Sequence, residues 1–391
     1  MNVLQIISGL DINSGGPSVS TNILVRGIQK KGINIQILTT VLKKKVSTLI
    51  FNDSVHYSYR VPGLNHFAYS FGFLTLLKTH PSDIIHVNGF WQYPPHVSCK
   101  YARRNKIPYI ITPRGMISPT ALSYSKWLKK TALFLYQKRD LKKATVIHVT
   151  SEKEVEFVRV LGLTNPVAVI PNPIEIKEKI IKQKKDKKRL AFIGRIHEIK
   201  NIESLIYAWA KVSHKQSWEL VLMGDGEKTY VHSLKTLISE LQLNDVKFAG
   251  FLVGDEKENM MQTLNLVIQP SFSENFSMVV GEALQNEIPV IASTGTPWED
   301  LNTYQCGWWV NNDVETLAKT IQQAISLSDE ERQQMGKRGR QLIIEKYSVE
   351  IVATQMIRLY EWILKGGEKP EFVQLSPFNS PSLYEREGVR R

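Results

Sequence analysis

The 391-residue sequence is poor in cysteine and contains no long apolar run. Cys99 and Cys306 lie far apart and outside any C-x-x-C spacing, which argues against a disulfide framework and against a zinc site. No apolar run reaches the roughly 18 to 20 residues that a membrane span needs. Residues 1–16 are typical of a first strand and its loop rather than of a signal peptide. We therefore expect a cytoplasmic protein that either stays in the cytosol or lies on a membrane without crossing it.

Acidic residues are scarce in the first half of the chain. Residues 1–185 contain 27 Lys and Arg against 9 Asp and Glu, whereas the remainder contains 23 against 28. This asymmetry predicts either an anionic partner for the first half or a solvated basic surface that has no partner. Because no helix-turn-helix, zinc-finger or RNA-binding motif accompanies the basic residues, we expect a membrane surface or a lipid diphosphate rather than nucleic acid.

The length of the chain suits two domains. Apolar strand-like runs alternate with helix-length amphipathic segments in both halves, which predicts parallel sheets covered on both faces. The expected strands are 2–8, 33–40, 83–89, 109–113, 144–150, 188–195, 218–224, 245–251, 264–271 and 288–294. The sequence therefore predicts an α/β protein with two Rossmann-like domains.

The boundary between these domains is expected near Asn172. Residues 169–188 contain two prolines followed by a lysine-rich run, which is typical of an exposed linker. This divides the chain into domains 1–171 and 172–345. A helix is expected over 348–364, and the Gly-, Pro- and Ser-rich residues 366–391 are expected to form a disordered tail.

Ligands of open α/β sheets bind at the carboxyl ends of strands, beside helix N-termini, so the loops after the strands carry the candidate site. The loop after the first strand contains Gly15 and Gly16, which allow the backbone to approach a phosphate or a sugar ring closely. This loop lacks the dinucleotide pattern G-x-G-x-x-G. A tight turn that requires a positive φ explains the two glycines about as well.

A second loop, "GRIHEIKN", follows the first strand of the second half. It carries Arg195 and Lys200, two cations of different shape that could converge on one anion. The alternative is a pair of surface cations. His197, which lies between them, is expected to be a solvated loop residue.

The third loop belongs to the stretch "SFSENFSMVVGE", where a buried strand ends and a helix follows. Ser277 is a plausible N-cap of that helix. Glu274 is expected on the turn and Glu282 more than one turn into the helix, so the two carboxylates are poorly placed to act as a close acid and base pair. Their spacing suggests contacts with two parts of one extended ligand, with the helix N-terminus facing an anionic segment between them. Two unrelated solvated glutamates are the alternative.

Taken in order, "GRIHEIKN", "MGDGE", "PSFSENFSMVVGEAL" and "PVIAST" resemble the C-terminal half of family 4 of the retaining glycosyltransferases. That family has the GT-B fold, in which two Rossmann-like domains with parallel sheets face each other across a cleft. Its signature Glu-x7-Glu is met by Glu274 and Glu282. The resemblance extends over nearly the whole chain up to about Lys365. It further implies that the C-terminal helix packs back on the first domain.

The resemblance implies a retaining hexosyltransferase that moves a sugar from a nucleoside diphosphate sugar to a glycan or lipid-linked acceptor, in the synthesis of bacterial surface polysaccharide or lipopolysaccharide. Arg195 and Lys200 would hold the donor diphosphate, Glu282 the ribose hydroxyls and Glu274 the donor sugar, with Arg195, Lys200 and Glu274 catalytic. The implied donor-binding residues are Gly15, Gly16, Gly194, Arg195, Lys200, Asn275, Phe276, Ser277 and Glu282. The alternatives are another GT-B enzyme, such as a sugar-phosphate glycosyltransferase, or a non-catalytic nucleotide-sugar-binding regulator or subunit.

We expect neither a metal nor another cofactor. The sequence contains no D-x-D motif, Asp225 between two glycines favours a turn, and the two cations of the second loop can neutralise a leaving diphosphate.

The sequence departs from the family at several positions. Ser277 replaces a frequent Gly, Arg114 replaces a frequent His, and Asn88 stands where a second His is common. His86 and Arg114 are expected on the acceptor or donor-sugar side, although a hydrogen-bonded structural histidine is the alternative for His86.

The segment 123–143 interleaves lysines and arginines with aromatic residues. If it is helical, it predicts peripheral association with the inner face of the cytoplasmic membrane. An ordinary domain helix with core aromatics and solvated lysines is the alternative.

Overall fold

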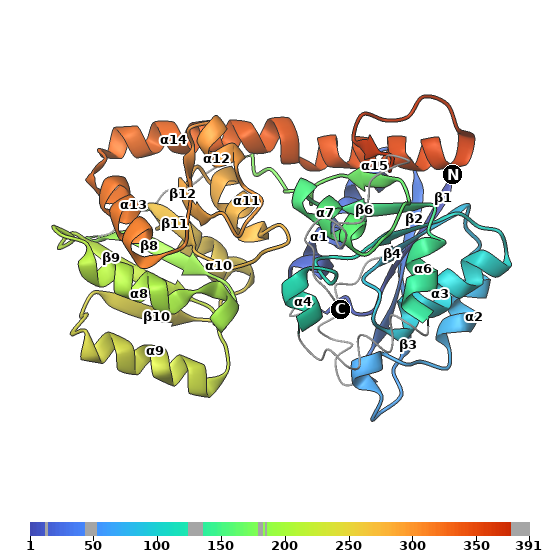
Figure 1. The fold of residues 1–391 in the computed structure, drawn as a ribbon, viewed down its shortest axis with the longest axis horizontal. Helices are drawn as coiled ribbons and strands as arrows, with labels where there is room; N and C mark the ends of the chain where they lie inside the picture. The colour runs from blue at the N-terminus through green and yellow to red at the C-terminus, as the bar shows by residue number, and fades with distance from the viewer. Residues whose placement is uncertain (12–14, 44–52, 124–135, 179–182, 184–185, 377–391) are drawn as a thin grey trace, which may run out of the picture. The chain divides into compact units, whose positions relative to one another are not determined.

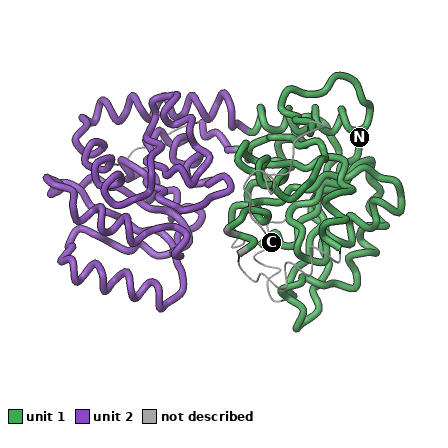
Figure 2. The backbone as a smooth tube through the Cα atoms, in the orientation of Figure 1, with its two compact units in different colours: residues 1–173, 349–391 green, residues 174–348 purple. Residues whose placement is uncertain are grey.

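The computed structural model describes residues 1–11, 15–43, 53–123, 136–178, 183 and 186–376, and the chain divides into two compact units (Figures 1 and 2). Unit 1 comprises Met1–Pro173 and Val349–Arg391, and unit 2 comprises Ile174–Ser348. The chain thus passes from unit 1 to unit 2 after Pro173 and returns after Ser348.

Unit 1 is built on an eight-stranded sheet with the order β14-β7-β6-β5-β4-β1-β2-β3. All of its strand pairs are parallel except β14 with β7. Its strands are β1 (Asn2–Ile7), β2 (Asn34–Val41), β3 (Val55–Tyr59), β4 (Ile84–Asn88), β5 (Tyr109–Thr112), β6 (Val146–Val149), β7 (Val167–Val169) and β14 (Val373–Gln374). Its helices are α1 (Gly16–Lys30), η2 (Asn65–Phe67), α2 (Phe73–Thr79), α3 (Tyr93–Arg104), α4 (Pro119–Ser123), α6 (Lys138–Lys142), α7 (Glu152–Val160) and α15 (Val349–Lys365).

Unit 2 contains a six-stranded parallel sheet with the order β10-β9-β8-β11-β12-β13. Its strands are β8 (Lys188–Ile193), β9 (Trp218–Met223), β10 (Val246–Gly250), β11 (Leu266–Gln269), β12 (Val290–Ser293) and β13 (Gly307–Val310). Its helices are η4 (Glu198–Lys200), α8 (Ile202–Lys211), α9 (Lys228–Glu240), α10 (Gly254–Met261), α11 (Met278–Gln285), α12 (Asp300–Thr303), α13 (Val314–Ser326), α14 (Asp329–Leu342) and η5 (Ile343–Tyr347).

Helices cover both faces of each sheet, and successive residues of a strand point to opposite faces. In unit 1, Val3 of β1 belongs to the apolar cluster that contains α1 and α15, whereas Leu4 belongs to the cluster that contains α2, α3 and α7. In unit 2, Phe192 of β8 packs in the cluster with α8 and α13, and Ile193 packs in the cluster with α11. This arrangement produces the near-continuous apolar runs from which the strands were predicted.

All strands predicted from the sequence are present, and the prediction of two parallel-sheet α/β domains is confirmed. The strands that the sequence did not predict are β3, β7, β13 and β14. β7 has three residues and β14 has two, which is too short for a periodic signal, and β13 is an edge strand that is mostly only half-buried. β3 reads "VHYSY" and lies at the edge of its sheet, so polar residues are tolerated along it.

The C-terminal helix α15 lies in the core of unit 1. Its buried face joins the apolar cluster of α1 and the sheet. A Cβ atom at Gly27 of α1 would lie 2.3 Å from Val349 Cγ1 and 3.3 Å from Ala353 Cβ. The absence of a side chain at Gly27 therefore allows the two helices to pack closely.

The expectation of a disordered tail over 366–391 is wrong for residues 366–376. Val373 is fully buried, and β14 pairs with the edge strand β7. Arg358 of α15 donates two hydrogen bonds, of 2.8 and 2.7 Å, to the carboxylate of Glu371. An edge strand and a bidentate ion pair thus order a segment whose composition alone favours disorder. Residues 377–391 lie outside the described residues.

The predicted linker 169–188 is also only partly exposed. Ile170, Asn172 and Ile174 are at most 7% exposed. The Ile174 amide, where the chain enters unit 2, donates a hydrogen bond to the carbonyl of Tyr347, close to the point where the chain leaves it. The start of the linker is therefore fixed by packing and hydrogen bonds.

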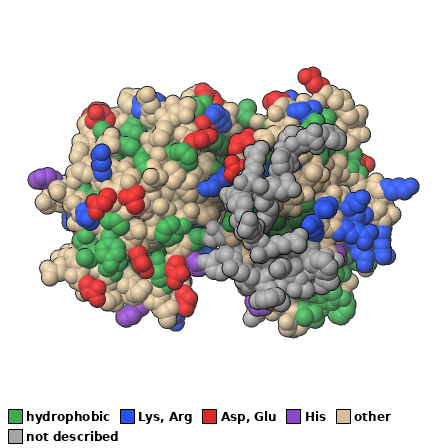
Figure 3. Space-filling view, in the orientation of Figure 1, with side chains coloured by type: hydrophobic (Ala, Val, Ile, Leu, Met, Phe, Trp, Pro, Cys, Tyr) green, Lys and Arg blue, Asp and Glu red, His purple; other side chains and the backbone are tan. Residues whose placement is uncertain are grey.

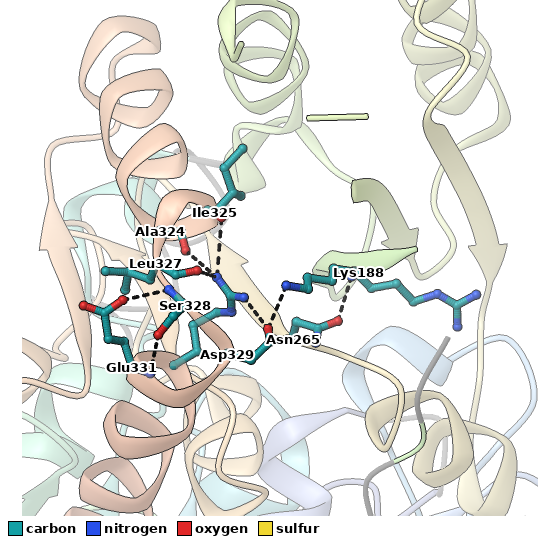
Figure 4. Close-up of polar contacts among 10 residues, drawn as sticks. Lys188, Asn265, Ala324, Ile325, Leu327, Ser328, Asp329 and Glu331 are labelled. Atoms are coloured by element: carbon teal, nitrogen blue, oxygen red, sulfur yellow. Dashed lines mark hydrogen bonds and ion pairs between the residues drawn. The ribbon is translucent and has the colours of Figure 1, made fainter. Parts of the chain in front are cut away.

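The junction of α13 and α14 is held by polar contacts that the sequence encodes locally (Figure 4). Ser328 and Glu331 form a capping box, which satisfies amides at the start of α14. The buried Arg332 guanidinium donates hydrogen bonds to the carbonyls of Ala324 and Leu327 at the end of α13. Asp329 forms a 2.8 Å ion pair with Lys188 at the start of β8, which joins α14 to the sheet.

Candidate active site

In unit 2 the direction of strand succession reverses between β8 and β11, which are neighbours in the centre of the sheet. Such a switch point is where open α/β sheets bind ligands, because the loops after the two strands diverge there. The loop after β8 is the "GRIHEIKN" segment, and the loop after β11 contains Glu274. The structure therefore brings together two segments that the sequence singled out separately.

Lys200 and Glu274 form an ion pair between these two loops. Their side chains are 16% and 15% exposed, so the pair is largely shielded from water. Ser271 Oγ donates a hydrogen bond of 3.2 Å to the same carboxylate, and the Phe272 amide donates one of 2.9 Å to the Ile199 carbonyl. The two loops are thus joined by hydrogen bonds and by a largely shielded ion pair.

Arg195 lies on the loop after β8 and is exposed. Within the described part of the chain, its guanidinium has no hydrogen bond or ion pair. Gly194 and Gly224 explain why the loop is tight: a Cβ atom at Gly224 would lie 1.8 Å from the Gly194 carbonyl oxygen. The Asp225 carboxylate accepts a hydrogen bond of 2.8 Å from the adjacent Gly226 amide, and its carbonyl accepts one of 2.8 Å from the Ile196 amide, so this segment pairs with the loop after β8 and does not form the predicted turn.

His197 has a structural role. Its Nδ1 accepts a hydrogen bond of 3.2 Å from the Ile199 amide, which caps the short helix η4 that ends at Lys200. The expectation of a merely solvated loop residue is corrected in this respect.

Glu282 lies on α11 and forms a 2.6 Å ion pair with Lys257 of α10. The Glu282 side chain is 29% exposed and the Lys257 side chain 30%. Both glutamates of the pair recognised in the sequence therefore have a lysine partner. Sequence reasoning missed Lys257, because an isolated helical lysine carries no pattern that distinguishes it from a solvated one.

Ser277 precedes α11 with φ 63° and ψ 80°, in the left-handed region. Its side chain makes no capping hydrogen bond, so the predicted hydroxyl cap is wrong. An N-cap serine bonds to the helix amides from an extended backbone, which this position does not have. A left-handed backbone costs a non-glycine residue about 1 to 2 kcal/mol, which explains why glycine is the expected residue here.

The segment around Asn275 and Phe276 is supported from inside unit 2. Phe276 is 4% exposed, and its ring centroid lies 5.1 Å from that of the fully buried Trp298. Trp298 Nε1 donates a hydrogen bond to the Phe276 carbonyl. Asn275 itself is partly exposed. Sequence reasoning missed Trp298, whose contact with the loop arises only through the fold.

The first glycine loop lies in unit 1, at the carboxyl end of β1. Gly15 is the N-cap of α1 with φ 80°, and a Cβ atom there would meet nothing within 4 Å. The positive φ therefore accounts for a glycine at this position. Gly16 begins the helix and Pro17 occupies its first turn. β1 and β4 are neighbours at the switch point of this sheet, so the loop lies where ligands bind in the fold.

His86 is buried in the core of unit 1. It is 1% exposed, with Nδ1 2.8 Å from the Tyr360 hydroxyl and Nε2 2.6 Å from Thr112 Oγ1. Burial, helped by His148 and Arg114, holds the pKa of His86 well below its ordinary value. These contacts favour the alternative of a hydrogen-bonded structural histidine, while a place beside the acceptor or the donor sugar stays a prediction.

The polar network extends to His148 of β6, which the sequence did not single out. Its Nε2 lies 2.8 Å from the Ile170 carbonyl and its Nδ1 lies 2.8 Å from Thr112 Oγ1. Because a carbonyl only accepts, Nε2 carries the proton and Nδ1 accepts from the Thr112 hydroxyl. Burial lowers the pKa of His148 to about 3, with a further contribution from Arg114.

Arg114 is engaged by unit 1 itself. It has φ 55°, and its guanidinium donates hydrogen bonds to the side chains of Asn88, Ser20, Thr21 and Asn172. Burial lowers the pKa of the guanidinium to about 10, while Glu154 and Tyr360 oppose that shift. Arg114 thus joins α1 and β4 to Asn172 by side-chain hydrogen bonds, and its expected place on the acceptor or donor-sugar side stays a prediction.

Both cysteines are buried and carry free thiols. Burial raises the pKa of Cys306 to about 12. Within the described residues, no helix has the length and apolarity needed to cross a membrane.

Comparison with known families assigns both halves of the chain. Residues 173–342 match the glycosyl transferases group 1, and residues 15–173 match the glycosyl transferase 4-like domain. N-acetyl-alpha-D-glucosaminyl L-malate synthase of Bacillus anthracis is 25% identical over 301 residues, which are 73% of this chain and 76% of that protein. An uncharacterized glycosyltransferase of Methanocaldococcus jannaschii, MJ1607, is 28% identical over 180 residues, which are 45% of each chain. The capsular polysaccharide biosynthesis glycosyltransferase CapM of Staphylococcus aureus is 25% identical over 208 residues, which are 50% of this chain and 51% of that protein.

Solved structures have the same fold. Sucrose-phosphate synthase from Thermosynechococcus elongatus superposes with a TM-score of 0.76 at 19% identity, covering 94% of this chain and all of that one. Anabaena HepE, solved in complex with UDP-glucose, superposes with a TM-score of 0.72 at 18% identity, covering 92% of this chain and 99% of that one. The chain therefore belongs to the group 1, family 4-like glycosyltransferases of the GT-B fold.

Proposed function

We propose that this glycosyltransferase transfers a hexosyl group, with retention of anomeric configuration, from a nucleoside diphosphate sugar to a glycan or lipid-linked acceptor. The observation that carries the proposal is the Lys200–Glu274 ion pair at the switch point of unit 2, beside the N-terminus of α11. A shielded cation, a carboxylate and a helix N-terminus offer separate contacts for a diphosphate and for sugar hydroxyls.

The diphosphate would displace Glu274 from Lys200. The lysine then shares the phosphate charge with Arg195, whose guanidinium has no other partner in the described residues. Glu274 becomes available to accept hydrogen bonds from the hydroxyls of the donor sugar. These cations stabilise charge that develops on the leaving diphosphate, which lowers the barrier without a metal or another cofactor.

Glu282 would bind the ribose hydroxyls from α11, in line with its partial exposure. Its ion pair with Lys257 orients the carboxylate for this contact. In the transfer step, the bond between the anomeric carbon and the diphosphate breaks and the acceptor oxygen takes its place on the same face. The acceptor proton passes to the departing diphosphate.

Relatives support the choice of substrates. HepE was solved with UDP and with UDP-glucose, so we propose a UDP-sugar as the donor. CapM is named for capsular polysaccharide biosynthesis, and we propose a similar bacterial surface polysaccharide as the product.

We also propose that unit 1 lies on the cytoplasmic face of the membrane. Figure 3 shows lysine and arginine side chains gathered over the region of α3 and α6. The sole acid of residues 93–109 and 136–145, Asp140, is buried and pairs with Arg103 and His96. The exposed cations are Lys100, Arg104, Lys106, Lys138, Arg139, Lys142 and Lys143. Each contributes about 1 kcal/mol near anionic lipid. Residues 124–135 of the predicted membrane helix lie outside the described residues.

The test is donor turnover in the presence of candidate UDP-sugars and acceptors, followed by NMR of the product. We expect release of UDP and an anomeric configuration equal to that of the donor. Lys200→Ala should abolish most turnover, whereas Lys211→Ala, which breaks an exposed ion pair with Glu315, should not. An inverted product would contradict retention, and UDP-sugar binding without any turnover would favour the non-catalytic alternative.

A further inference from the structure

An aromatic cluster lies at the carboxyl edge of the unit 1 sheet. β3 and β4 run parallel to the intervening strands, so the segments that follow Tyr59 and Asn88 leave from the same edge as the glycine loop after β1. The segment after β4 lies at the switch point of this sheet. The segment after Tyr59 contains Phe67, Tyr69 and Phe71, and the segment after Asn88 leads to Tyr93. We call these four side chains the aromatic platform.

The rings of the platform form an unbroken series. The centroids of Phe67 and Tyr93 are 6.2 Å apart, those of Tyr93 and Tyr69 are 4.6 Å apart, and those of Tyr69 and Phe71 are 5.2 Å apart. Phe71 is 75% exposed and Phe67 is 38% exposed, while the two tyrosines between them are partly buried. Figure 3 shows the hydrophobic area that covers the region of η2. Large exposed rings that touch one another mark a binding surface more often than isolated exposed residues do.

The segment that carries the platform is fixed in place. The Val61 amide donates a hydrogen bond of 2.8 Å to the Tyr69 carbonyl, which closes the loop between them. Gln92 Nε2 donates one of 3.0 Å to the His66 carbonyl and so joins the two segments. Ala68 is fully buried with φ 52°. The exposure of the phenylalanines is therefore a property of an ordered loop.

The chemistry of the platform suits a neutral ligand with apolar faces and hydroxyl groups. Residues 61–77 contain no Lys, Arg, Asp or Glu. Within the described residues, the phenol oxygens of Tyr69 and Tyr93 make no hydrogen bond, so they remain available as donors and acceptors. Pyranose rings present C–H faces that stack on aromatic rings and a rim of hydroxyls that bind phenols. An anionic lipid surface is less well matched, because residues 61–77 carry no cation, whereas seven exposed lysines and arginines gather on and beside α3 and α6.

We propose that the aromatic platform binds the neutral sugar chain of the acceptor. This inference rests on the proposed function, since it names the acceptor of that reaction as an oligosaccharide of several pyranose rings. The basic surface and the platform would then have separate roles, one toward the membrane and one toward the growing glycan.

The test compares full-length wild-type protein with three variants on an array of neutral oligosaccharides of glucose, galactose, mannose and N-acetylhexosamine. Phe71→Ala removes the most exposed ring, and Tyr69→Phe removes one hydroxyl and keeps the ring. Tyr207→Ala removes an aromatic side chain of 45% exposure on α8 and serves as the matched control. Wild type and Tyr207→Ala should bind the same chains, and Phe71→Ala should bind them about tenfold more weakly, which corresponds to about 1.4 kcal/mol.

Donor hydrolysis, measured as UDP release in the same samples, separates this inference from the proposed function. Oligosaccharide binding that depends on Phe71, without any donor hydrolysis, would contradict the proposed function and support the binding role of the aromatic platform. Donor hydrolysis with no chain bound, or with equal binding by Phe71→Ala and wild type, would overturn the platform. Phe71-dependent adsorption to neutral lipid vesicles in place of oligosaccharides would also overturn it.

Discussion

Acidification should destabilise unit 1 because two buried histidines are kept neutral in the native state. His86 and His148 share Thr112 in one hydrogen-bond network, and burial lowers the pKa of both. A histidine whose pKa is lowered by folding contributes stability above the pKa of the unfolded chain, which is about 6.5, and that stability is lost as the pH falls below this value.

The expected loss can be worked out for each ring. Consider a histidine that stays neutral in the native state and titrates normally in the unfolded chain. It lowers the free energy of unfolding by about 1.4 kcal/mol when the pH falls from about 7.5 to about 5.5. His148, with a pKa of about 3, meets this condition throughout the window. With His86 also neutral, the two rings together should cost about 3 kcal/mol.

The assay is urea unfolding at both pH values, with hydrogen exchange of β4 and β6 peptides to assign the transition to unit 1. His148→Gln keeps a donor and an acceptor but cannot take up a proton, so it should reduce the acid loss by about 1.4 kcal/mol. His232→Gln, on the exposed face of α9, should leave the loss unchanged. If the free energy of unfolding fell by the same amount between the two pH values in His148→Gln and in wild type, the reasoning would be refuted.

Three further outcomes are expected. Arg195→Ala should lower kcat because it acts on the leaving diphosphate, and Glu282→Ala should mainly raise the KM for the donor; steady-state kinetics with equal effects on both parameters would contradict this division. Ser277→Gly should stabilise unit 2 by up to about 1 kcal/mol, since it relieves a left-handed backbone at some cost in chain entropy, and a lower melting temperature would oppose that view. Gly27→Ala should destabilise unit 1 by about 1 to 3 kcal/mol in urea unfolding through overpacking against α15, whereas Gly72→Ala, with 3.6 Å to its nearest neighbour, should be nearly neutral.

The sequence predicts most of the fold because the sheets are buried on both faces. Strands such as β4 and β11 are fully buried and mostly apolar, and the parallel order follows from the helices between the strands. The short edge strands lack such a signal. β14 forms because β7 offers an unpaired edge, which no local pattern in "FVQL" reveals.

The sequence predicts a site residue where the charged or polar residue lies in a recognisable loop after a strand. Lys200 and Glu274 were both recognised, but their direct ion pair depends on β8 and β11 being neighbours. Lys257 and Trp298 were missed because their roles arise from contacts between distant segments. The hydrogen bonds of Arg114 could not be predicted for the same reason, since its partners in α1, in β4 and at Asn172 lie far from it in the sequence.

The central claim, that the loops after β8 and β11 bind the diphosphate of the donor, is tested most directly by calorimetric titration of UDP. Wild type should bind one UDP per chain, and Lys211→Ala should bind it equally well. Lys200→Ala should bind about ten- to a hundredfold more weakly, because a charge-assisted hydrogen bond contributes about 1.5 to 3 kcal/mol. Equal affinities of the three proteins for UDP, or no binding by wild type, would contradict the claim.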